Sequence, residues 1–87
     1  MSHRFEDVLT HIVAFLHERM EGVGTPEINE ASHFTKDLNV GSLLIFSIVE
    51  NLEETYGIVV PLQLLYQQKV QTVGDLAQEV TRLANES

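Results

Sequence analysis

The sequence contains no cysteine, no tryptophan and only two prolines in its 87 residues. Without cysteine, neither a disulfide nor a thiolate-bound metal ion can brace the fold. A chain of this length has much surface for its volume, so it cannot enclose a deep active site and also keep a sizeable core. We therefore expect a single domain over residues 1–87, held together by aliphatic packing. The missing cysteines are consistent with a reducing compartment.

Basic residues are also scarce, with 5 Lys and Arg against 13 Asp and Glu and a net charge of -8. This balance argues against nucleic acid and against anionic membrane surfaces, because like charges repel. It favours partner proteins with basic patches. An acidic surface that serves solubility alone would give the same composition.

Long apolar runs are absent too, and none approaches the length of a membrane span. The first ten residues interleave apolar side chains with Glu6, Asp7 and Thr10. They therefore lack the continuous apolar segment of a signal peptide, and we expect a cytoplasmic protein.

An amphipathic helix is predicted near the N-terminus, with Ser2 as its N-cap and Gly22, Gly24 and Pro26 beyond its end. Its apolar residues recur at steps of three and four. They are Phe5, Val8, Leu9, Ile12, Val13, Leu16 and Met20.

A long connection over residues 21 to 41 follows, and connections of this length are usually functional or pinned by anchors. A second helix is predicted from Ser42 to Tyr56, ended by Gly57 as C-cap. The expected anchors of the connection are Ile28, Phe34 and Leu38. The apolar stripe of the helix consists of Ile45, Ile48, Val49, Leu52 and Tyr56.

The remainder of the chain is predicted to hold an extended connector and two more helices. The β-branched run 58–60 has no second run to pair with, so we do not expect a strand. A short helical segment is predicted over 62–68, and Thr72 with Asp75 resembles the capping box that opens a last helix. Inward-facing residues of the short segment are expected to be Leu62, Leu65 and Tyr66.

These elements predict an all-α fold of three main helices, one short helix and one long loop. Its expected core comprises Phe5, Val8, Leu9, Ile12, Leu16, Phe34, Leu38, Ile45, Val49, Leu52, Tyr56, Leu76 and Val80.

A catalytic constellation is not apparent. The histidines at 3, 11, 17 and 33 lack metal-site spacing and are interpreted as solvated surface residues. Ser42 has no GxSxG context. We therefore do not expect an enzyme, and we expect neither a catalytic residue nor a metal site.

Four motifs in order resemble the acyl carrier protein family. Within 34–43, Asp37-Leu38 and Ser42-Leu43 match a signature that typically reads aspartate-leucine-glycine, one or two residues, then aspartate-serine-leucine. The residues at 52–58 resemble the end of the family's second helix, Pro61 falls at a common proline, and 72–76 resembles the start of the last helix. The resemblance covers nearly the whole chain and implies a small four-helix acyl-carrier-like bundle.

The resemblance implies a 4′-phosphopantetheine arm on Ser42, flanked by Gly41 and Leu43, with acyl groups held on its thiol as thioesters. A carrier serine needs no activating base, because a phosphopantetheinyl transferase supplies the chemistry. The first turn of a helix exposes such a serine, and its N–H groups favour a phosphate there.

By the same resemblance, the acidic side of the second helix docks acyl-transferring or ligase enzymes that carry basic patches, and the protein is a monomer without membrane insertion. The expected docking residues are Leu44, Glu50, Glu53 and Glu54. An acyl pocket is expected between the second and third helices, lined by Ile45, Phe46, Val49, Ile58, Leu62 and Leu65.

The sequence departs from the family at several positions. Gly41 replaces the usual aspartate before the serine, and Asn39 replaces a glycine. Leu43 and Leu44 are expected to project from the core as an apolar patch beside Ser42, which suggests a less charge-driven partner. Three functions remain open: an acyl carrier for fatty-acid, lipid or polyketide-type synthesis, an aminoacyl or peptidyl carrier for a nonribosomal or ligase system, and an unmodified protein-interaction adaptor.

Overall fold

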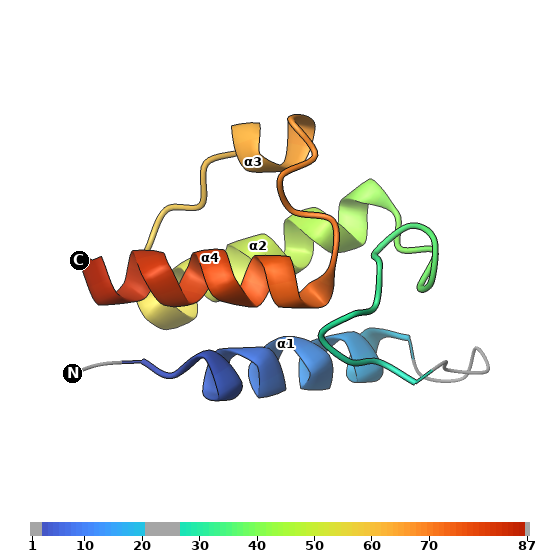
Figure 1. The fold of residues 1–87 in the computed structure, drawn as a ribbon, viewed down its shortest axis with the longest axis horizontal. Helices are drawn as coiled ribbons and strands as arrows, with labels where there is room; N and C mark the ends of the chain where they lie inside the picture. The colour runs from blue at the N-terminus through green and yellow to red at the C-terminus, as the bar shows by residue number, and fades with distance from the viewer. Residues whose placement is uncertain (1–2, 21–26, 87) are drawn as a thin grey trace.

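Helices α1, α2, α3 and α4 make up the secondary structure of the described residues, 3–20 and 27–86, in this computed structural model (Figure 1). They span Phe5–Arg19, Ser42–Tyr56, Gln63–Tyr66 and Val73–Glu86. The predicted all-α fold is confirmed, with α3 shorter than the predicted 62–68. None of these helices is long and apolar enough to cross a membrane.

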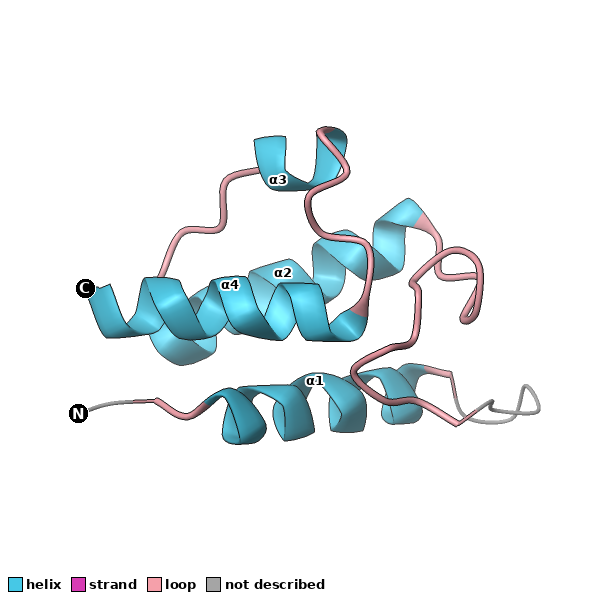
Figure 2. Ribbon diagram, viewed as in Figure 1, coloured by secondary structure: helices cyan, strands magenta, loops and turns pink. Residues whose placement is uncertain are grey.

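Helix α1 packs against α4 and α2 (Figure 2), whereas α3 lies on the side of α2 and α4 that faces away from α1. The centre of the core is aliphatic, as predicted, and each such side chain contributes roughly 1.5–3 kcal/mol when buried. Phe5, Leu9, Ile45 and Tyr56 lie at its edge, only partly buried. The largest fully buried side chains are those of Val8, Ile12, Leu16, Ile48, Leu52, Val73, Leu76 and Val80.

The helix ends follow local chemistry. Thr72 Oγ1 accepts a hydrogen bond from the Asp75 N–H at 3.0 Å, and the Asp75 carboxylate accepts one from the Thr72 N–H at 3.1 Å. The predicted capping box is therefore confirmed, with aspartate in the role usual for glutamate. Gly57 ends α2 at φ 64°, as predicted for a C-cap glycine.

The N-cap of α1 differs from the prediction. Arg4 occupies it, without a side-chain hydrogen bond. The predicted cap, Ser2, lies outside the described residues, and so do Gly22, Gly24 and Pro26.

The long connection is anchored in the core by Ile28, Phe34 and Leu38, as predicted, and also by Val40. Its backbone is bonded to the start of α4. The N–H groups of Val73 and Gly74 donate to the carbonyl oxygens of Ser32 and Glu30, both at 2.9 Å. These bonds satisfy N–H groups that the first turn of a helix leaves unpaired.

The connector to α3 forms no strand, as predicted, and Ile58 and Val60 are buried with Val59 exposed between them. The expected inward orientation of Leu62 and Tyr66 is wrong, because they are 47% and 73% exposed. Leu64 and Leu65 pack against the core instead. In a helix of one turn, the buried residues on either side decide which face turns inward, here Val60 and Val70.

The interpretation of the histidines as solvated holds fully only for His17, which is exposed. His11 Nε2 lies 2.7 Å from Asn51 Oδ1 and so joins α1 to α2. The rings of His3 and His11 meet the Tyr56 ring edge-on, with centroids 5.1 and 5.9 Å away. Burial, and secondarily the negative charge of Asp7, raises the pKa of Tyr56.

The close approach of Gly74 to the long connection predicts a stability difference between two glycine positions. A Cβ at Gly74 would lie 2.8 Å from the Glu30 carbonyl oxygen, whereas a Cβ at Gly41 would meet nothing within 4 Å. We expect Gly74→Ala to lower the free energy of unfolding by about 1–3 kcal/mol, through overpacking. Gly41→Ala should change it by less than about 1 kcal/mol.

Urea unfolding followed by circular dichroism measures both variants. Gly74→Ala unfolding at the same urea midpoint as Gly41→Ala would contradict the close approach.

Candidate functional site

The long connection delivers Ser42 to the surface at the start of α2. Gly41 is the N-cap in an extended conformation, and Ser42 is the first helical residue, with an exposed side chain. Its hydroxyl makes no hydrogen bond with the residues that the structure describes. The side chain is therefore accessible and uncommitted.

Buried residues just before Ser42 fix the position of the serine. Val40 and Leu38 are both buried, and the Val40 N–H donates to the Phe34 carbonyl oxygen at 2.7 Å. Asn39 between them has φ 52°, a left-handed conformation that asparagine adopts more readily than most residues, so it can stand where the family has glycine.

A single turn over residues 33–37 precedes this segment and is capped by two side chains. His33 Nδ1 accepts hydrogen bonds from the N–H groups of Thr35 and Lys36 at 3.2 and 3.1 Å. The Asp37 carboxylate accepts one from the His33 N–H at 2.8 Å. His33 thus shapes the approach to Ser42, a role that sequence reasoning missed because imidazole is rarely read as a cap.

A cavity of about 440 Å³ opens beside Ser42, between the 33–36 turn, the first turns of α2 and residues 65–71. One part of its lining is apolar or aromatic: Phe34, Ile45, Phe46, Leu65, Tyr66 and Val70. The other part is polar: His33, Thr35, Lys36, Ser42, Gln68 and Gln71.

A second, more open groove of about 760 Å³ lies between α2 and the connector to α3. The six residues expected to form one acyl pocket are divided between the two hollows. Ile45 and Leu65 line the cavity, Val49 and Leu62 line the groove, and Phe46 lines both. Ile58 lines neither and is buried in the core.

The expected apolar patch beside Ser42 is half right. Leu43 is 84% exposed, but Leu44 is half-buried and packs against the core. Leu44 lies four residues before Ile48 and eight before Leu52, so all three share one face of the helix. The expected projection of Leu44 is therefore wrong.

The three glutamates of α2 are not equivalent. Glu50 and Glu54 are exposed. The Glu53 carboxylate accepts a hydrogen bond from the Val60 N–H at 2.9 Å, so it also holds the connector in place. Within residues 3–20 and 27–86, no group of His, Asp and Glu side chains is arranged to hold a metal ion.

Comparison with known proteins identifies the relatives of this site. The family described as "Phosphopantetheine attachment site" matches residues 13–80. A probable acyl carrier protein of Caulobacter vibrioides is 39% identical over 57 residues, which cover 66% of this chain and 64% of the relative. An acyl carrier protein of Acidothermus cellulolyticus is 31% identical over 70 residues, 80% of each chain. No solved structure gives a significant match.

The capping role of His33 predicts which substitutions the turn before Ser42 tolerates. His33→Ala removes the acceptor for two N–H groups and should lower the free energy of unfolding by about 0.5–2 kcal/mol, as loss of a helix cap does. It should also speed amide hydrogen exchange at Thr35 and Lys36. His33→Asn should restore slow exchange, because the Asn Oδ1 replaces Nδ1 as acceptor.

The control is His17→Ala, which removes an exposed histidine of α1. Unchanged exchange at Thr35 and Lys36 in His33→Ala would show that the imidazole does not cap the turn.

Proposed function

The chain belongs to the phosphopantetheine-attachment family of acyl carrier proteins, which are carriers and not enzymes, and from that premise we propose that Ser42 is the residue that holds its arm. The arm supplies a thiol on which acyl groups are carried as thioesters. The observation that carries the assignment is the exposed, uncommitted hydroxyl of Ser42 at the first residue of α2, beside a cavity.

The surroundings of Ser42 fit a phosphodiester. The first turn of α2 contains no acidic side chain, and Gly41 leaves open space next to the serine. The N–H groups of a first helical turn have no intrahelical partners, and the helix dipole favours negative charge there. A phosphate on Ser42 would therefore meet donors and little repulsion.

Ser42 has no neighbouring base to activate it, and this agrees with the proposal. A serine hydroxyl becomes a useful nucleophile only beside a base. In a carrier, the phosphopantetheinyl transferase supplies that base, so the carrier contributes only exposure and a fixed position.

Partner enzymes are proposed to dock on the exposed side of α2, next to the groove. Glu50 and Glu54 present negative charge to basic patches, and Leu43 adds apolar contact close to the serine. Glu53 lies on the same side of α2, but its carboxylate already accepts a hydrogen bond from the connector. Leu44, expected to belong to this surface, is half-buried and packs against the core instead.

The proposed cargo is an acyl intermediate of fatty-acid, lipid or polyketide-type synthesis, carried by a cytoplasmic monomer. The cavity and the groove beside α2 support this proposal, because each has a partly apolar lining that favours an acyl chain. Gly41 favours a second candidate, an unmodified adaptor, because it lacks the carboxylate that the family's aspartate offers to the transferase. An aminoacyl or peptidyl carrier is distinguished by which cargo a loading enzyme transfers.

Covalent loading tests the role of Ser42. Incubation with coenzyme A and a broad-specificity phosphopantetheinyl transferase should add one phosphopantetheine unit to the intact mass. Ser42→Ala should gain nothing, and Ser47→Ala, in which an exposed serine of α2 is replaced, should load normally. No gain with several transferases would overturn the carrier assignment and leave the adaptor.

Charge reversal tests the docking surface. Glu50→Lys with Glu54→Lys should slow loading by about tenfold at low salt, because opposite charges steer encounter. The difference should shrink as salt is added. Glu18→Lys with Glu6→Lys makes the same charge change on the exposed side of α1 and serves as control. Equal loading rates for the two double variants would exclude α2 as the docking face.

A further inference from the structure

The cavity beside Ser42 has a charge opposite to that of the whole chain. The net charge is -8, yet none of the described residues that line the cavity is Asp or Glu. Lys36 lines it together with Ser42, and so does His33. The lining of the cavity beside the serine therefore favours an anion, although the chain as a whole is acidic.

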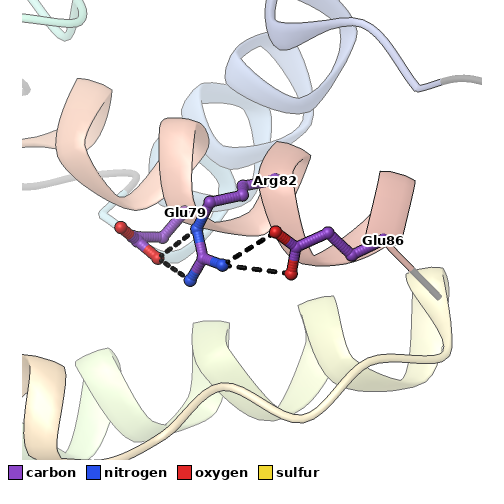
Figure 3. Close-up of polar contacts among 3 residues, drawn as sticks. All are labelled: Glu79, Arg82 and Glu86. Carbon is purple, nitrogen blue, oxygen red and sulfur yellow. Dashed lines mark hydrogen bonds and ion pairs between the residues drawn. The ribbon is translucent and has the colours of Figure 1, made fainter.

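Lys36 is also a cation without a partner. The ion pairs among residues 3–20 and 27–86 are made by Arg82, with Glu79 at 2.7 Å and Glu86 at 3.1 Å (Figure 3). Arg19 stacks on the Phe15 ring at 4.8 Å. Lys36 has neither an ion pair nor a ring contact with any described residue, so its ammonium group is available to a ligand.

The backbone of Lys36 is held in place although its side chain is exposed. Its N–H donates to His33 Nδ1, and the next N–H, of Asp37, donates to the His33 carbonyl oxygen at 3.0 Å. Because Nδ1 accepts hydrogen bonds, the proton of the neutral His33 ring is on Nε2. The turn thus places the residues Lys36 and His33 at the cavity, with the backbone of Lys36 held by hydrogen bonds.

We propose that Lys36 binds the phosphodiester of the arm on Ser42 and directs the serine-linked end of the arm over the cavity. This inference rests on the proposed function. The phosphate carries negative charge and is tethered to a residue of the same cavity, so it stands near Lys36 at high effective concentration. Gly41 contributes no carboxylate that would compete for the lysine. Lys36 is a positioning residue and takes no part in bond making.

The contact is an exposed ion pair, so its strength depends on salt. The Debye length falls from about 10 Å at 0.1 M salt to about 3 Å at 1 M. An arm held by Lys36 should therefore be restrained at low salt and released at high salt, whereas an arm held by apolar contacts should not respond in this way.

Nuclear magnetic resonance of the phosphopantetheinylated protein tests the proposal without any partner enzyme. In the wild type at low salt, loading should shift the amide signals of Thr35, Lys36 and Asp37, and the ³¹P signal of the arm should be broad. Lys36→Gln should lose at least about half of these shifts and narrow the ³¹P line, and about 1 M salt should do the same to the wild type. Lys36→Arg should retain both features.

Lys69→Gln is the matched control, because it removes the same charge from the other lysine, which does not line the cavity. Loaded Lys36→Gln with wild-type shifts and linewidth would overturn the role of Lys36 while leaving the arm on Ser42. A protein that gains no mass on loading would overturn both proposals. Lys36 could bind the phosphodiester of the arm or a carboxylate of the cargo, and arms that end in a free thiol, an acetyl group or a succinyl group separate these two anions. Shifts that appear only with the succinyl arm would assign Lys36 to a cargo carboxylate and overturn the phosphodiester contact.

Discussion

Backbone hydrogen bonds join the long connection to the start of α4, and the candidate site depends on them. The Phe34 N–H donates to the Gln71 carbonyl oxygen at 2.9 Å, beside the bonds that Val73 and Gly74 make to Ser32 and Glu30. They hold one wall of the cavity, the 33–36 turn, against another, residues 68–71. Without these hydrogen bonds, Phe34 and Leu38 would still be apolar, but their register against α4 would not be fixed. Ser42 would then not be held beside the cavity.

Much of this arrangement was predictable from residues that act locally. Helix α2 has the predicted bounds, because a regular apolar stripe runs into a C-cap glycine, Gly57. The start of α4 was predictable because Thr72 and Asp75 cap each other three residues apart. The anchors Ile28, Phe34 and Leu38 were predictable because they are apolar residues in a polar segment, and burying them is favourable.

What was not predictable depends on residues far apart in the sequence. His11 is half-buried because α1 packs against α2, where the imidazole meets Asn51 and Tyr56. His33 caps a turn, and no hydrophobic periodicity reveals the amides of that turn. The cavity joins residues 33–36 to 65–71, so it could not be found from either segment alone. Leu44 is a different case, because its burial was predictable from its position one turn before Ile48. It was instead expected to belong to an exposed apolar patch beside Ser42.

The chemistry of a carrier explains why so small a chain suffices and why its departures from the family gather around the serine. A residue that is modified by another enzyme needs exposure and position, and both come from the helix start and the anchored connection. The charges nearby are then free to vary, provided that they suit a phosphate. Gly41 brings no carboxylate next to Ser42, and Lys36 places a positive charge on the lining of the same cavity. On the proposed role of Ser42, both residues act in the same direction, because each favours a phosphate at this site.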